Sequence, residues 1–176
     1  MSERGTHVAI ARSRAGVART ALLPTLTPPT VADVRAAVAE VPDPELPVLS
    51  VVDLGIVHRV EVDAAGIRVV ILPTFVGCPA LDIIRASIAD RLADFGLPVA
   101  VDTTFEVPWT SDRISAAGKL ALASVGIAPP SEPADVRCPF CASGRVVMDS
   151  AFGPTQCRSL FYCRACRQPF EALKAV

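Results

Sequence analysis

Hydrophobic residues recur at helical spacing where the regular part of the chain begins. Val31, Val34 and Val38 lie three or four positions apart, and Thr30 just before them is a suitable N-cap. Pro42 ends the pattern, because a proline inside a helix removes a hydrogen bond and clashes with the preceding turn. The spacing predicts a helix that stops before Pro42.

Alternating and β-branched residues follow and predict strands. Residues 56–62 and 67–72 are rich in Val and Ile, and the DAAG stretch between them has the composition of a hairpin turn that ends in Gly66. Residues 99–107 alternate apolar and polar positions, as in a strand with one buried face. The sequence therefore predicts a hairpin and a third strand.

Two further helices are predicted on either side of the third strand. An apolar stripe over residues 81–95 predicts the first, and Pro79 suits its first position, so that Cys78 falls at or next to the N-cap. The second is short and is predicted to open at Thr110 or Ser111.

Five of the six cysteines lie in the C-terminal part of the chain, and four of them have the spacing of a metal site. Cys138 and Cys141 form one CxxC pair, and Cys163 and Cys166 form a second, with 21 residues between the pairs. Two such pairs supply four sulfurs to one tetrahedral ion, which predicts a structural zinc ribbon. Rubredoxin-like iron is the alternative, because thiolate geometry alone does not separate iron from zinc.

Cys157 is the fifth cysteine of this region and lies outside both pairs. It is either a buried small hydrophobic residue or spare ligand, or an exposed thiol that helps to hold or pass a metal. The sequence leaves these interpretations open.

The charge pattern predicts no nucleic-acid or membrane partner. Residues 134–176 carry six basic and three acidic side chains, and four thiolates with one divalent metal reduce their net charge from +3 to +1, a weak footprint for phosphate. The whole chain has a net charge of −1. Although 51% of the residues are hydrophobic, no apolar run approaches the roughly 18 residues that span a bilayer. The apolar content allows a surface that docks on a partner.

Composition also sets the expected domain boundaries. Residues 1–29 carry four arginines against one acid and predict a disordered tail or a start codon placed too early, with a targeting peptide as the alternative. Residues 30–127 are the predicted first domain, 128–134 a linker and 135–176 the zinc ribbon. The predicted fold class is α+β: a small sheet covered by helices, followed by the four-cysteine zinc-ribbon module. CxxC pairs without a secretory signal indicate reduced thiols and a cytoplasmic protein.

Cys78 is the second candidate site. A thiol at a helix N-terminus meets the helix dipole and free N–H groups, and both favour the thiolate. The residue could be a nucleophile, a ligand for iron or an iron–sulfur cluster, or a packed cysteine at a helix cap. No histidine base is predicted beside it, which argues against a Cys–His hydrolase, and no catalytic residue is assigned.

The loops around Cys78 resemble a known family. VPDPELPVLSVVDLGIV, a hairpin and then T-x-x-GCP-x-L resemble the small iron–sulfur assembly domain of the MIP or SufT-like family, although Phe75-Val76 stand where the family usually has Ser or Pro. The resemblance implies that Cys78 is a transient ligand for iron or a cluster. Asp53, Glu45 or Thr74 would then shape its pocket, although acidic residues in loops also commonly cap turns.

A longer resemblance covers roughly residues 30–174. VPWTSDRISAAGKLALASVGIAPP, CPFC, FGPTQC and LFYCRACRQPFEALK, in this order, resemble the PaaD family of accessory proteins of the phenylacetyl-CoA 1,2-epoxidase. It gives Cys157 a family position. It implies an accessory or maturation role in aerobic phenylacetate catabolism, with the epoxidase subunits or the epoxidase reductase as partners. The implied metals are structural zinc and transient iron or iron–sulfur cargo.

Three functions remain open at this point. The chain could be a maturation factor, a stoichiometric non-catalytic subunit or effector of the oxygenase complex, or a redox component with an iron-loaded ribbon. The chain contains no Glu-x-x-His pair, which a di-iron carboxylate site in a helix bundle would need. The sequence therefore gives no support for oxygenation by this chain itself, and whether it is an enzyme stays open.

Overall fold

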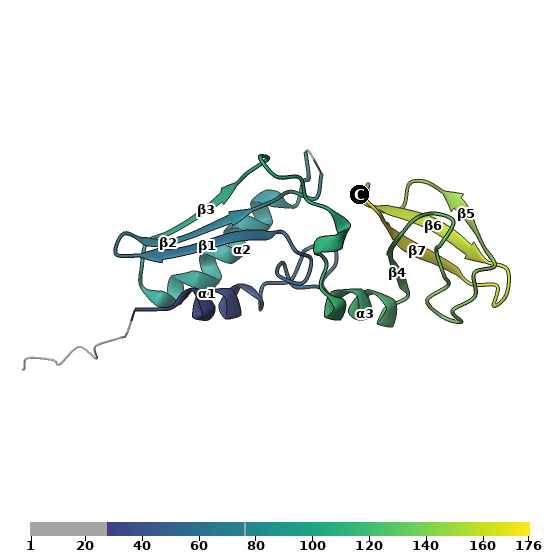
Figure 1. Cartoon of the computed structure of the whole chain (residues 1–176), viewed down its shortest axis with the longest axis horizontal. Coiled ribbons are helices and arrows are strands. Elements are labelled where there is room, and N and C mark those ends of the chain that lie inside the picture. Colours follow the sequence, from purple (N-terminus) through teal and green to yellow (C-terminus); the bar gives the residue numbers. More distant parts are fainter. Residues whose placement is uncertain (1–27, 76) are drawn as a thin grey trace, which may run out of the picture.

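The computed structural model describes residues 28–75 and 77–176, and within them two modules follow each other along an elongated molecule (Figure 1). The disordered tail predicted over residues 1–29 lies almost wholly outside the described residues. The elements are α1 (Val31–Val38), β1 (Val57–Asp63), β2 (Gly66–Ile71), α2 (Leu81–Leu92), η1 (Ala93–Phe95), β3 (Val99–Thr103), η2 (Ser111–Arg113), α3 (Ala116–Ser124), β4 (Ile127–Ser131), β5 (Val146–Ser150), β6 (Arg158–Cys163) and β7 (Pro169–Lys174).

The first module is built on a three-stranded sheet in the order β1-β2-β3. β1 and β2 are antiparallel and meet at the predicted hairpin turn, where Asp63 Oδ1 accepts hydrogen bonds from the N–H groups of Ala65 and Gly66. β3 runs parallel to β2, because α2 carries the chain back before β3 begins. The hairpin predicted from the sequence is therefore confirmed. The third strand is confirmed only over Val99–Thr103; its predicted extension to residue 107 is wrong, and Phe105 and Val107 are exposed.

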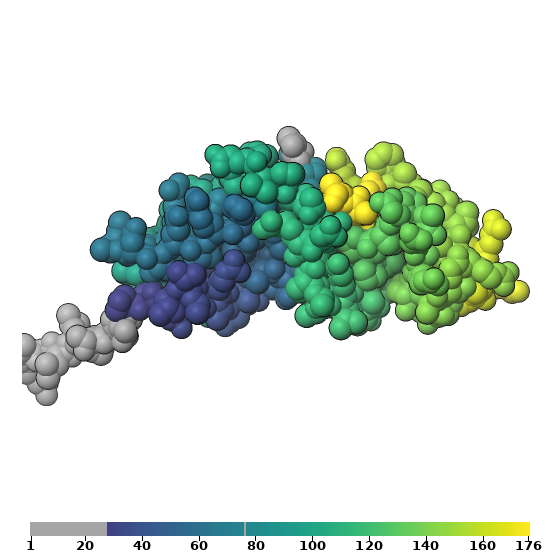
Figure 2. Space-filling view, in the orientation of Figure 1, coloured from purple at the N-terminus to yellow at the C-terminus, as the bar shows by residue number. Residues whose placement is uncertain are grey.

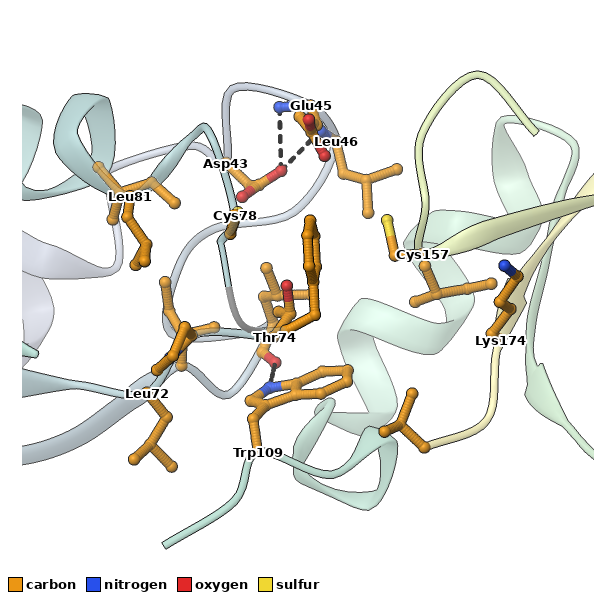
Figure 3. Close-up of a pocket in the computed structure, with 17 residues that line it drawn as sticks. Asp43, Glu45, Leu46, Leu72, Thr74, Cys78, Leu81, Trp109, Cys157 and Lys174 are labelled. Atoms are coloured by element: carbon orange, nitrogen blue, oxygen red, sulfur yellow. Dashed lines mark hydrogen bonds between the residues drawn. The ribbon is translucent and has the colours of Figure 1, made fainter. Parts of the chain in front are cut away.

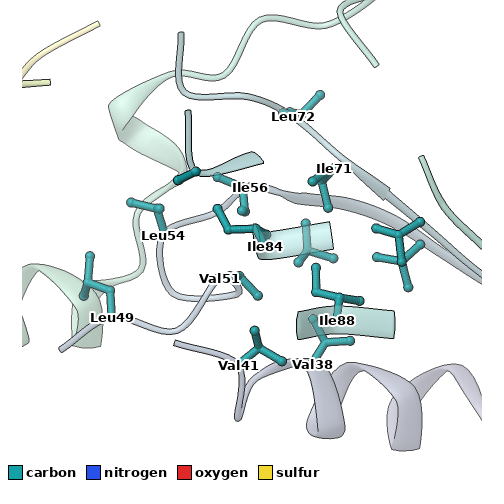
Figure 4. Packing of buried hydrophobic residues seen from close by; sticks show 14 of the residues in the cluster. Val38, Val41, Leu49, Val51, Leu54, Ile56, Ile71, Leu72, Ile84 and Ile88 are labelled. Atoms are coloured by element: carbon teal, nitrogen blue, oxygen red, sulfur yellow. The ribbon is translucent and has the colours of Figure 1, made fainter. Parts of the chain in front are cut away.

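Two helices cover one face of this sheet. Figure 4 shows Ile84 and Ile88 of α2 between Ile71 of β2 and Val38 of α1, and all four side chains are buried. Arg68, on β2, lies at the opposite face, where it is exposed and forms an ion pair with a β3 aspartate. The face opposite the helices is solvated at Arg68, but Val70 on the same face of β2 is buried, so burial alternates less strictly than the sequence pattern predicts.

The helix starts agree only in part with the sequence. Thr30 caps α1 in a reciprocal capping box with Asp33, as predicted. The prediction that Thr110 or Ser111 opens the third helix is wrong, because the extended backbone of Ile114 separates the short η2 from α3. Ser115 caps α3 instead, since its hydroxyl accepts a hydrogen bond from the N–H of Gly118.

The second module is a four-stranded sheet in the order β4-β7-β6-β5. β4 falls largely within residues 128–134, so the prediction of a linker there is wrong for most of that stretch. Pro129 and Pro130 cause the error, because they lack N–H donors and are typical of linkers. They are tolerated because β4 is an edge strand that pairs only with β7.

The two modules share a packed boundary. Leu173 of β7 is 4% exposed and belongs to the same hydrophobic cluster as the core of the first module. The main-chain oxygen of Val176 accepts a hydrogen bond from the N–H of Ser111 at 3.2 Å. Figure 2 shows the yellow C-terminal residues against the middle of the molecule, where the modules meet. The C-terminal end of the ribbon therefore packs against the hydrophobic core of the first module.

Among residues 28–75 and 77–176, no helix combines the length and apolar character required for crossing a membrane.

Candidate functional site

The four ribbon cysteines converge on one point. The sulfurs of Cys138, Cys141, Cys163 and Cys166 all lie within 4.8 Å of one another. The distance is 3.6 Å between Cys138 and Cys166 and 3.6 Å between Cys141 and Cys163. Around a tetrahedral zinc ion with Zn–S bonds of about 2.3 Å, the sulfurs are separated by about 3.8 Å. The four cysteines therefore fit a zinc ion.

The same backbone turn presents each pair of sulfurs. In the first pair the N–H of Ala142 donates to the carbonyl oxygen of Cys138, and in the second the N–H of Arg167 donates to that of Cys163. Ala142 and Arg167 also share a positive φ, 59° and 63°, although neither is glycine. A positive φ is energetically costly for a residue other than glycine, yet both turns contain one. This indicates that the backbone conformation of both turns is set by the need to place the two sulfurs of each pair.

A cavity of about 110 Å³ lies where the two modules meet. Most of its wall is apolar, and Trp109 closes one side with its indole N–H donating to the carbonyl oxygen of Leu54. Cys78 of the first module and Cys157 of the second both line it (Figure 3). The polar or ionisable side chains in the wall are those of Asp43, Glu45, Thr74, Cys78, Trp109, Cys157 and Lys174.

Asp43 holds the loop that forms the acidic side of this cavity. Its Oδ1 accepts hydrogen bonds from the N–H groups of Glu45 at 3.0 Å and Leu46 at 2.8 Å. Its side chain is buried, and burial raises the pKa of Asp43, while the two hydrogen bonds and the charge of Arg158 act in the opposite direction. The loop thus places two carboxyl groups, one of them buried, beside a thiol.

The surroundings of Cys78 raise its pKa, whereas its position beside a helix predicts a lowered one. Burial is the main reason that the pKa of Cys78 is raised, and the charges of Glu45 and Asp43 add to this effect. Hydrogen bonds from the Ala80 backbone and the Thr74 side chain lower the pKa but do not compensate. The prediction that Pro79 takes the first helical position is also wrong, because the N-cap of α2 is Ala80 and the sulfur lies farther from the helix.

Cys157 is anchored by its own loop. Its sulfur lies 3.0 Å from the hydroxyl oxygen of Thr155, and Arg158 Nε donates to that same oxygen at 3.0 Å. Arg158 also donates to Glu171 of β7 and, at 3.4 Å, to the carbonyl oxygen of Glu45 in the first module. One arginine therefore ties the Cys157 loop both to the ribbon sheet and to the acidic loop.

The structure brings together Cys78, Glu45, Thr74 and Cys157 among the residues predicted from the sequence, but it places Asp53 elsewhere. Asp53 does not line the cavity; its carboxylate accepts hydrogen bonds from the hydroxyls of Ser50 at 2.8 Å and Ser115 at 2.6 Å. Asp53 thus connects its own turn to the N-cap of α3.

Asp53→Ala is therefore expected to lower stability and leave the cavity unchanged. Two hydroxyl groups would lose a charged acceptor, at a cost of about 1–3 kcal/mol. Urea unfolding measures this loss, and the rate of alkylation of Cys78 by a maleimide reports the cavity. Wild-type stability together with an altered Cys78 rate would instead make Asp53 part of the site.

Sequence reasoning about side-chain roles misses three contributors to this region. In the sequence, Asp43 is noticeable only as part of the VPDPELP stretch. Its role in holding the acidic loop depends on its burial, which the sequence does not show. Trp109 and Arg158 come from segments far away in the sequence, and no local pattern connects them with Cys78. The position of Arg158 directly after Cys157 is the one sequence feature that could have linked one of these three residues to the site.

Comparison with known proteins agrees with the two modules. A family model described as a PaaD zinc beta ribbon domain matches residues 124–174, and one described as an iron-sulfur cluster assembly protein matches residues 31–105. The chain is 36% identical over 162 residues to a protein of Escherichia coli (strain K12) that is named as one of the subunits of 1,2-phenylacetyl-CoA epoxidase. The match covers 88% of this chain and 98% of the E. coli protein.

Shorter relatives match about half of the chain. The Fe-S protein maturation auxiliary factor YitW of Bacillus subtilis (strain 168) is 37% identical over 95 residues, 51% of this chain and 90% of its own length. The Fe-S protein maturation auxiliary factor SufT of Staphylococcus aureus (strain USA300) is 37% identical over 85 residues, 46% of this chain and 93% of its own length.

Fold, cysteine site and matches together define a class of protein in which an iron–sulfur cluster assembly domain is followed by a zinc β-ribbon. Within that class, the chain belongs to the PaaD family.

Proposed function

We propose that this chain is an accessory factor that helps to insert iron or an iron–sulfur cluster into phenylacetyl-CoA 1,2-epoxidase or its reductase, in the cytoplasm, during aerobic phenylacetate catabolism. The observation that carries the proposal is the position of Cys78 in the cavity, with Asp43, Glu45 and Thr74 beside it. The names of the E. coli, Bacillus and Staphylococcus relatives support it.

The chemistry of this wall suits cargo that must be released again. A soft sulfur next to hard carboxylates matches iron better than a set of thiolates alone would. Because the pKa of Cys78 is raised, the thiol keeps its proton until a cation displaces it, and metal binding is then coupled to proton release. A single thiol that must first lose its proton binds a metal less tightly than the four sulfurs of the ribbon do.

The same cavity gives little support for catalysis by this chain. No histidine lines it, so Cys78 has no imidazole base within the described wall. The chain is better explained as a carrier that acts on other proteins than as an enzyme that turns over a small substrate.

Co-expression with the epoxidase tests the proposal. Without this chain, or with Cys78→Ser in its place, we expect the iron and acid-labile sulfide per epoxidase complex to fall several-fold, because cargo transfer needs the sulfur. Both quantities are measured on the purified complex, and Cys141→Ser is unsuitable as a control because it disturbs the ribbon. Full metal content in all three preparations, with turnover still impaired, would contradict the proposal.

That contradicting outcome would favour the second candidate function, a stoichiometric non-catalytic subunit or effector of the oxygenase. Large aromatic side chains on the surface support this candidate, since Phe105, Phe140 and Phe152 are 62%, 57% and 71% exposed. Co-purification with the epoxidase at a fixed ratio would support the subunit role, and transient association would support the maturation role.

A further inference from the structure

Cys157 lines the same cavity as Cys78. Building on the proposed function, we propose that Cys157 is a second sulfur ligand, so that Cys78 and Cys157 together hold an iron–sulfur cluster between the two modules. The ribbon would then supply a ligand to the cargo in addition to any role in docking. The proposal concerns these two sulfurs and leaves the zinc site of the ribbon unchanged.

The size of the cavity limits what it can hold. At about 110 Å³ it is well below the roughly 300–1,000 Å³ of pockets that bind drug-sized molecules. The cavity could therefore not enclose a nucleotide or a coenzyme A thioester, whereas cargo of a few heavy atoms fits inside it. Sulfur ligands on both sides of such a space indicate a thiophilic cargo rather than a polar metabolite.

Both walls contribute donors, and Figure 3 draws Cys78 and Cys157 on opposite sides of the cavity. Cys78 lies on one side beside Asp43, and Cys157 lies on the other. Asp43 is only 5% exposed, and while its Oδ1 accepts two hydrogen bonds, its Oδ2 accepts none from the described residues. That oxygen is available to a positively charged metal centre in the cavity, which would offset the cost of burying the carboxyl group.

The sulfur of Cys157 has the surroundings of a metal ligand. Because Thr155 Oγ1 accepts a hydrogen bond from Arg158 Nε, its own proton is available to donate to the sulfur 3.0 Å away. Arg158 itself is fixed, since its side chain is 13% exposed and is paired with Glu171 at 2.6 Å. Outer hydrogen bonds of this kind orient ligands at metal centres.

The spacing of the donors favours a cluster over a single ion. In residues 28–75 and 77–176, the ribbon cysteines are the one group of three or more Cys, His, Asp or Glu side chains placed to hold a metal ion. The cavity therefore does not present a finished shell for one ion. A cluster brings its own bridging sulfides, so it needs protein sulfurs that are farther apart and placed on different sides.

The test follows each cysteine separately. The full-length, zinc-loaded chain is incubated without oxygen with ferric iron, or with ferric iron and sulfide, and unbound iron and sulfide are then removed by gel filtration; two ferric ions and two sulfides give a two-iron, two-sulfur cluster without a further oxidant. The chain is next treated with N-ethylmaleimide, and the modification of every cysteine is measured by mass spectrometry. We expect iron with sulfide to slow the modification of both Cys78 and Cys157 at least tenfold, and iron alone to leave both nearly unchanged.

Variants test the ligand and its support. Cys157→Ser is expected to reduce the protection of Cys78 at least tenfold while zinc stays at one per chain, which shows that the ribbon is still folded. Thr155→Val removes the hydroxyl beside the sulfur and should shorten the lifetime of the cluster absorption band, whereas Thr155→Ser keeps the hydroxyl and should restore it.

Each contrary result has a definite meaning. Protection of Cys78 with Cys157 modified at its unprotected rate would overturn the two-sulfur site and leave the maturation role intact. Protection of neither residue would contradict both. Equal protection of the two residues by iron alone would overturn the assignment of a cluster.

Discussion

Cys163→Ser is expected to remove zinc from the C-terminal module and to unfold that module. Cys163 is fully buried, and its sulfur is one of the four that converge. Apparent binding free energies of structural zinc sites are about 10–16 kcal/mol, which is comparable to or larger than the total stability of a small domain. The apolar cluster of the module contains only seven buried residues, so it cannot replace this contribution.

Zinc content per chain and the rate of limited proteolysis within residues 135–176 measure this effect. Cys157→Ser is the matched control, because it makes the same substitution 6 positions earlier, outside the four-sulfur set, and should keep full zinc. A Cys163→Ser chain that retained one tightly bound zinc and resisted protease would refute the ligand assignment.

Gly55→Ala is expected to destabilise the first module strongly, by about 3 kcal/mol or more. Gly55 has a φ of +75°, which costs other residues about 1–2 kcal/mol. A Cβ at this position would also overlap the carbonyl group of Arg113, whose side chain donates to the carbonyl oxygen of Gly55 at 2.9 Å. The turn and η2 would have to move apart, and backbone atoms cannot do so as easily as a flexible side chain.

Gly96→Ala separates the two contributions. Gly96 has a similar φ of +69°, but nothing lies within 4 Å of a Cβ built there. Its substitution should therefore cost only the conformational part, about 1–2 kcal/mol. Denaturant unfolding of both variants gives the difference, and equal losses of stability would contradict the close approach of Gly55 to Arg113.

The parts of the fold that depend on short-range patterns could be predicted from the sequence. The α1 cap, the hairpin and the four ribbon ligands each depend on residues close together in the chain or on a fixed spacing. β4 was missed because its two prolines resemble a linker, and only its place at the edge of a sheet makes them acceptable.

The cavity depends on long-range packing, and this is why the sequence did not reveal it. Cys78 and Cys157 come from different modules, and they line one cavity only because Leu173 and Val176 return to the first module. The sequence around Cys78 also gave a wrong indication of how readily this thiol ionises. The nearby helix suggested a thiolate at Cys78, whereas burial and two carboxyl groups raise its pKa.

The main-chain contact between Val176 and Ser111 affects how the protein can be handled in the laboratory. Because Val176 is hydrogen-bonded at the module boundary and lines the cavity, a purification tag or fluorescent protein joined directly after it would start inside this junction. The first described residues lie at the far end of the molecule (Figure 1). A bulky group attached beside Val176 would press on the boundary between the modules, so such an attachment offers a way to separate them deliberately.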